Sequence, residues 1–77
     1  MKAIVKVTLR KGVLDPQGKA IEQALHHLGF NGAENVRQGK FIEMTVPDGT
    51  GQDKIAEMCR QLLANPVTED FEIELVA

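Results

Sequence analysis

Apolar and polar residues alternate along residues 2–10. One side of this segment consists of apolar residues: Ala3, Val5, Val7 and Leu9. The other side carries polar residues: Lys6, Thr8 and Arg10. A period of two with several β-branched residues is typical of a strand that buries one face. The pattern therefore predicts a first strand here, and Lys11-Gly12 is expected to turn the chain after it.

A helix is predicted between Asp15 and Gly29. Asp15 can cap the free N–H groups of the first turn, and Pro16 suits the first helical position. The apolar residues that follow recur at helical spacing and form one stripe: Ala20, Ile21, Ala24, Leu25 and Leu28. Gly29 is a natural residue at which the helix ends.

The segment of residues 36–46 is predicted to be extended. Ile42, Met44 and Val46 are expected to point to one side of it. Phe41, Glu43 and Thr45 are expected to point to the other side. Gly39 interrupts it, and two interpretations stay open. Gly39 marks either a bulge in one long strand or, with Gln38, a tight turn between two short strands. We favour the bulge, because the part before Gly39 is short and not very apolar.

A second helix is predicted after the turn-forming residues 47–51. Its apolar stripe is expected to contain Ile55, Met58, Cys59, Leu62 and Leu63. Thr50 and Asp53 have the spacing of a capping box at its start, and Asn65-Pro66 should end it. A last strand should follow, with Phe71, Ile73 and Leu75 inward and with Glu72 and Glu74 outward.

The predicted fold class is α+β, a two-layer sandwich of order β-α-β-(β)-α-β in a single domain, residues 1–77. Because each helix has one apolar stripe, both helices are expected to lie on one face of a small, largely antiparallel sheet. The other face is expected to show Lys6, Thr8, Arg10, Phe41, Glu43, Thr45, Glu72 and Glu74. These mixed charges suit packing between two copies, with Lys6 or Arg10 meeting Glu72 or Glu74. Pairing through a sheet edge is the alternative.

The chain has only 77 residues, so its hydrophobic core alone is expected to give little stability. Such a domain buries only about 60% of the surface that its unfolded chain exposes. Cys59 is the only cysteine, and with the adjacent His26 and His27 it cannot form a four-ligand zinc site. Self-association or a partner subunit is therefore expected.

No apolar run is long enough for a membrane span and no signal peptide is evident, so we expect a cytoplasmic location.

The composition excludes several kinds of chemistry. The chain has no serine, so a Ser-His-Asp system is impossible. Its net charge of −2 gives no basic footprint for nucleic acid. Cys59 is expected to be packed in the core, and residues 48–51 form either a turn with a helix cap or a phosphate site at a helix start. We predict no catalytic residue, no bound cofactor and no metal site in this chain.

Four basic residues flank the predicted strand ends: Arg10, Lys11, Arg37 and Lys40. Scattered charge that aids solubility is the simpler interpretation. If the strand ends converge, these residues form a positive patch that suits an acidic partner surface or a nucleotide phosphate.

Four blocks of the sequence resemble one family. They are Val7–Ile21, Leu28–Phe30, Val36–Glu43 and Leu62–Leu75. Within them, Leu-Asp-Pro-Gln-Gly and Leu-Ala-Asn-Pro-Val are not generic helix or turn sequences. Together the blocks resemble the PurS family, small accessory subunits of phosphoribosylformylglycinamidine (FGAM) synthase.

The resemblance implies a role in de novo purine synthesis. It implies a non-catalytic subunit that bridges a glutaminase subunit and a large ATP-dependent synthetase subunit and assists ammonia transfer between them. It also implies self-association into a homodimer or tetramer. ATP, Mg²⁺ and glutamine are then used by the partner subunits, and neither nucleic acid nor a membrane is a partner. The alternative is a stand-alone regulatory domain of the ACT type that senses a small metabolite.

Partner contacts are expected in two exposed segments, Arg10–Gly18 and Arg37–Lys40. These segments hold residues that the core does not require, which is typical of functional loops. The candidate contact residues are Arg10, Lys11, Asp15, Gln17, Arg37 and Lys40. Charge reversal at Arg10 and Arg37 is expected to weaken assembly without affecting the fold.

Overall fold

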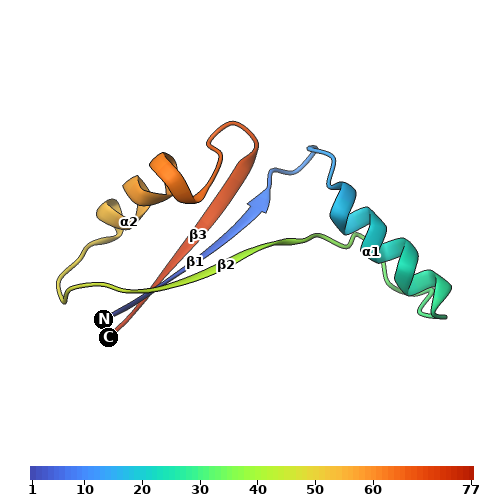
Figure 1. The fold of residues 1–77 in the computed structure, drawn as a ribbon, viewed down its shortest axis with the longest axis horizontal. Helices are drawn as coiled ribbons and strands as arrows, with labels where there is room; N and C mark the ends of the chain where they lie inside the picture. The colour runs from blue at the N-terminus through green and yellow to red at the C-terminus, as the bar shows by residue number, and fades with distance from the viewer.

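The computed structural model describes residues 1–77 and contains three strands and two helices (Figure 1). Their bounds are β1 Lys2–Leu9, α1 Pro16–His27, β2 Gly39–Thr45, α2 Gln52–Met58 with its π-helical continuation η1 Cys59–Leu63, and β3 Glu69–Val76. The strands form one antiparallel sheet of order β2-β1-β3. The predicted α+β class is confirmed, without the bracketed extra strand. No helix is long and apolar enough to cross a membrane.

The core lies on the sheet face that α2 covers. In the central strand β1, Val5 pairs with Ile42 of β2 and Ile73 of β3, so the three apolar sides coincide. Val5 is fully buried, as are Ile55 and Cys59 from the α2–η1 segment. The burial of Cys59 confirms that it is a packing residue.

The opposite sheet face is polar and exposed, as predicted. Lys6 lies directly across from Glu72 on this face, and Lys2 Nζ is 3.3 Å from Glu43 Oε2. Arg10 differs from the prediction, because it lies just beyond the end of β1 and its Nε is 3.4 Å from Asp70 Oδ1. Ion pairs across an exposed face contribute little to stability.

The first helix lies elsewhere than expected. α1 extends past one end of the sheet instead of covering the face beside α2 (Figure 1), which makes the chain 47 × 26 × 14 Å. Its apolar stripe stays largely exposed, and only Leu25 is half-buried. The pattern of the sequence shows that this stripe is apolar, but it does not specify which surface covers it.

Both interpretations of Gly39 are wrong. β2 is a single regular strand that begins at Gly39, which pairs with Thr8 of β1, and residues 36–38 form no strand. A side chain at this position is excluded, because a Cβ on Gly39 would overlap the backbone oxygen of Val7. The glycine is therefore required by the close approach of β2 to the central strand.

The second helix differs from the prediction at its end. The Ala64 N–H donates to Cys59 O at 2.9 Å, five residues back, so η1 holds more residues per turn than an α-helix. Because each turn of η1 contains more residues, Leu62 is shifted out of the stripe that α-helical spacing predicts. Leu62 was predicted to be buried in that stripe, but it is 83% exposed. Leu63 is half-buried instead and Ala64 is buried.

The predicted capping box at the start of α2 does not form. Gly51 is the N-cap residue, and no side chain accepts a hydrogen bond from the first turn. The Thr50 hydroxyl instead donates to Pro47 O at 2.6 Å within the preceding turn. Asp48 lies 3.0 Å from the N-terminal amine. Local turn bonds thus use the side chains that a cap would need.

Candidate functional site

The start of α1 is fixed to the segment before β2 by the carboxylate of Asp15. Its Oδ1 accepts the Gly18 N–H at 2.8 Å, which is the predicted N-cap, and its Oδ2 accepts the Gln38 N–H at 3.0 Å. Gly18 is buried against this segment, and a Cβ there would overlap the backbone oxygen of Val36. The Asp-Pro-Gln-Gly sequence is thereby explained, because it provides a cap, a helix start and a position without a side chain.

A second carboxylate attaches α1 to the same segment. Glu22 Oε1 accepts the Val36 N–H at 3.3 Å, and its Oε2 lies 3.6 Å from Lys19 Nζ. The N–H groups of Gln38 and Gly18 lower the pKa of Asp15, and the N–H of Val36 lowers the pKa of Glu22. Both shifts arise because hydrogen bonds favour the charged carboxylate.

These lowered pKa values predict that the attachment of α1 weakens in acid. In the unfolded chain the carboxyls titrate near 3.8 for Asp15 and 4.5 for Glu22, above their folded values. Their contribution to stability is therefore present at neutral pH and is lost as the pH falls through the folded pKa values. We expect the Tm advantage of the wild type over Asp15→Asn, measured by thermal unfolding, to shrink as the pH falls below about 4. A Tm difference that is the same at every pH would contradict this.

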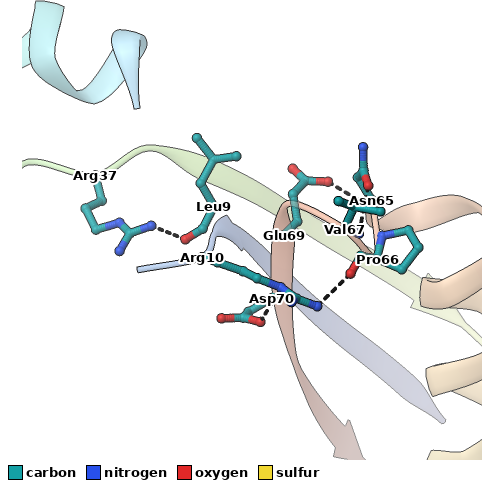
Figure 2. Close-up of polar contacts among 8 residues, drawn as sticks. All are labelled: Leu9, Arg10, Arg37, Asn65, Pro66, Val67, Glu69 and Asp70. Atoms are coloured by element: carbon teal, nitrogen blue, oxygen red, sulfur yellow. Dashed lines mark hydrogen bonds and ion pairs between the residues drawn. The ribbon is translucent and has the colours of Figure 1, made fainter. Parts of the chain in front are cut away.

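Arg10 and Arg37 hold the end of β1 from two sides (Figure 2). Arg37 Nη2 donates to Leu9 O. Arg10 Nη2 donates to Pro66 O at 2.6 Å, beside its ion pair with Asp70. Both guanidinium groups are thus engaged within the chain. The expectation that charge reversal here leaves the fold unaffected is therefore not supported by the structure.

The loop before β3 is held by its own side chains (Figure 2). Asn65 Oδ1 accepts the Val67 N–H at 2.9 Å, and Glu69 Oε1 accepts the Asn65 N–H at 2.7 Å. These bonds account for Asn-Pro-Val as a local turn. They leave Val67 76% exposed at the tip of the loop.

Three of the six predicted contact residues line one open groove of about 570 Å³ beside α1: Lys11, Asp15 and Arg37. Lys19 adds a further positive charge, and Val13, Leu14 and Val36 add apolar surface. Arg10 instead faces Pro66 and Asp70. Gln17 and Lys40 are exposed and do not line the groove. The structure therefore brings together one half of the predicted set.

Sequence reasoning missed the bonds that connect distant segments. Neither the bond from Gln38 to Asp15 nor that from Val36 to Glu22 has a local signal, because 23 and 14 residues separate the partners. Only the need for glycine at position 18 hints at a close backbone approach, since a helix interior disfavours glycine.

The other candidate groups have structural roles. His26 Nε2 donates to Ala33 O at 2.8 Å, and burial raises the pKa of the Cys59 thiol. The residues before α2 are engaged in the turn described above. No group of three or more His, Cys, Asp or Glu side chains lies close enough to hold a metal ion.

A family model described as PurS, phosphoribosylformylglycinamidine (FGAM) synthase, matches residues 2–77. The chain belongs to the PurS family. It is 44% identical over 78 residues to the FGAM synthase subunit PurS of Methanocaldococcus jannaschii, covering 96% of this chain and 93% of that protein. It is 43% identical over 76 residues to the PurS subunit of Bacillus subtilis, covering 96% and 90%.

Solved structures of PurS proteins share this fold. The structure of Bacillus subtilis PurS has a TM-score of 0.89 at 42% identity and covers 99% of this chain and 98% of that one. A chain in the structure of PurLQS from Thermotoga maritima has a TM-score of 0.83 at 30% identity, covering 97% and 95%. The resemblance to PurS, and with it the role as a subunit of FGAM synthase, a ligase of purine biosynthesis, is confirmed.

Proposed function

We propose that this chain is a non-catalytic subunit that joins the glutaminase and the ATP-dependent synthetase subunits of FGAM synthase and assists ammonia transfer between them. The observation that carries the proposal is the match to PurS along residues 2–77. The likeness to a chain of the PurLQS structure supports it, because that structure is named for PurS together with two further subunits. The chain acts as one domain of residues 1–77, in the cytoplasm, and associates with itself.

In this proposal the chemistry belongs to the partner subunits. One hydrolyses glutamine and releases ammonia, and the other uses ATP and Mg²⁺ to convert formylglycinamide ribonucleotide and ammonia into FGAM. This chain binds no cofactor. Its part is to keep the two active sites together, so that ammonia does not escape into water, where it becomes protonated and loses its nucleophilic lone pair.

The proposed partner contacts include Lys11, Gln17 and Lys40. These three side chains are exposed and form no hydrogen bond or ion pair within the chain, so their polar groups are available to a partner. Arg10, Asp15 and Arg37 are also proposed as contacts, but they additionally fix the fold. The positive charges beside the groove favour an acidic surface on the partner.

The proposal predicts that the two partner subunits form one complex only when this chain is present. Mixed with both purified subunits, the wild type should give a single species in size-exclusion chromatography. Lys11→Glu with Lys40→Glu should weaken that complex by about tenfold or more, because two attractive charges become repulsive. Lys54→Glu, the reversal of an exposed lysine on α2, is the control and should bind like the wild type.

Two results would contradict different parts of this account. If the glutaminase and synthetase subunits co-elute without the chain, the bridging role is wrong. If the double reversal binds as tightly as the Lys54→Glu control, bridging stands and the proposed contacts at Lys11 and Lys40 are wrong.

A further inference from the structure

A second hollow lies on the polar side of the sheet, near the end of β1. Its volume is about 310 Å³, at the lower end of the range of small-molecule sites. The polar side chains that line it are Lys6, Thr8, Lys11, Arg37, Asp70 and Glu72. They come from β1 and the loop after it, from the segment before β2, and from β3. The tertiary fold therefore assembles the hollow, and no local sequence motif reveals it.

The hydrogen-bond donors of this hollow are largely unused within the chain. Lys6 and Lys11 form neither an ion pair nor a hydrogen bond, and the Thr8 hydroxyl has no hydrogen-bond partner. Arg37 donates from Nη2 to Leu9 O (Figure 2), which leaves its Nε and Nη1 without a partner. Ammonium, guanidinium and hydroxyl donors from separate segments are thus available to one ligand.

Positive charge is in excess around the hollow. Of its two carboxylates, Asp70 is paired with Arg10, which lies outside the hollow, at 3.4 Å. Glu72 lies directly across from Lys6 on the neighbouring strand. The other two basic residues of the hollow form no ion pair with a carboxylate. The hollow is therefore positive, although the whole chain has a net charge of −2.

We propose that this hollow binds the phosphate group of a phosphorylated small molecule. A phosphate monoester has a charge of about −1.5 to −2 at neutral pH and three strong acceptor oxygens. These features match the two basic residues in excess, Lys11 and Arg37, and the free Thr8 hydroxyl. A small concave site suits a small ligand. The inference goes beyond the proposed function, which assigns this chain no small-molecule ligand.

Ribose 5-phosphate, a simple phosphate monoester, is the probe for this inference. Titrated into the ¹⁵N-labelled full chain, it should give saturable NMR shifts with a dissociation constant below about 1 mM. The largest amide shifts should fall within residues 6–11 and at Arg37. Ribose, or sodium chloride at matched ionic strength, should not reproduce them. Shifts that do not saturate, or that sodium chloride reproduces, would overturn the inference.

Two matched pairs of variants locate the site. Lys11→Gln should raise the dissociation constant for ribose 5-phosphate about tenfold, because a charge-assisted hydrogen bond is lost. Lys40→Gln should change it less than about twofold, since Lys40 is also exposed and unpaired but does not line the hollow. Lys6→Gln should likewise weaken binding more than Lys2→Gln, although both lysines are exposed on β1. Equal effects within each pair would overturn the placement of the phosphate in this hollow.

The same variants separate this inference from the proposed function. If ribose 5-phosphate does not bind but Lys11→Gln weakens the complex of the three subunits, the hollow receives an acidic group of a partner. The inference is then wrong and the proposed function stands. If ribose 5-phosphate binds as predicted but Lys11→Gln assembles like the wild type, the inference stands and the proposed partner contact at Lys11 is wrong.

Discussion

Replacing Gly39 with alanine is expected to lower the free energy of unfolding by about 1–3 kcal/mol or more. The added Cβ would overlap the backbone oxygen of Val7 and would lie 2.9 Å from Thr8 Cγ2. Val7 belongs to the central strand and is fully buried, so it has no free space into which to move. Urea unfolding at one fixed protein concentration measures the change, since self-association makes stability depend on concentration.

The matched control for this variant is Gly32→Ala. A Cβ at Gly32 meets nothing within 4 Å, and its backbone is not in the left-handed region. Its free energy of unfolding should therefore stay within about 0.5 kcal/mol of the wild type. Equal changes for the two glycines would show that the close approach of β2 to β1 is not what requires Gly39.

Truncation of Ile55 to alanine should cost about 2–5 kcal/mol of unfolding free energy. Ile55 is the largest fully buried side chain, and it joins α2 to the core of the sheet. Few other residues are buried in the core. Loss of the Ile55 side chain therefore removes much of the apolar contact between α2 and the sheet. The same denaturant titration, with loss of α2 followed by hydrogen exchange, measures the effect.

Leu62→Ala is the control for this truncation. The residue has comparable volume and was expected from its helical spacing to be buried, yet its side chain is 83% exposed. Its truncation should change the unfolding free energy by less than about 0.5 kcal/mol. A cost comparable to that of Ile55→Ala would mean that Leu62 packs inward and that η1 does not rotate it out.

The strands and helices were predictable because their signals are local. Alternation around Val5 and the Asp15-Pro16 start of α1 each depend on neighbouring residues, and the structure confirms both. The place of α1 was not predictable, because an apolar stripe has the same pattern whether its own sheet or another chain covers it. Leu62 was misplaced because sequence periodicity assumes α-helical turns, whereas η1 is π-helical.

The candidate site was predictable only in its local parts. Asp15 was identified as a helix cap, but its second bond, to Gln38, depends on a loop closure that no short pattern reveals. Likewise, Arg10 and Arg37 stood out as unusual charges at strand ends. Their bonds to Pro66 O and Leu9 O follow from the way the tertiary fold brings those backbone oxygens to them.

The central claim is that this chain is a required but non-catalytic part of FGAM synthase. The most direct test is glutamine-dependent FGAM synthesis by the purified glutaminase and synthetase subunits, measured with and without the chain. The account predicts that glutamine supports synthesis only when the chain is added, and that the chain alone has no activity. Equal glutamine-dependent rates with and without the chain would contradict it.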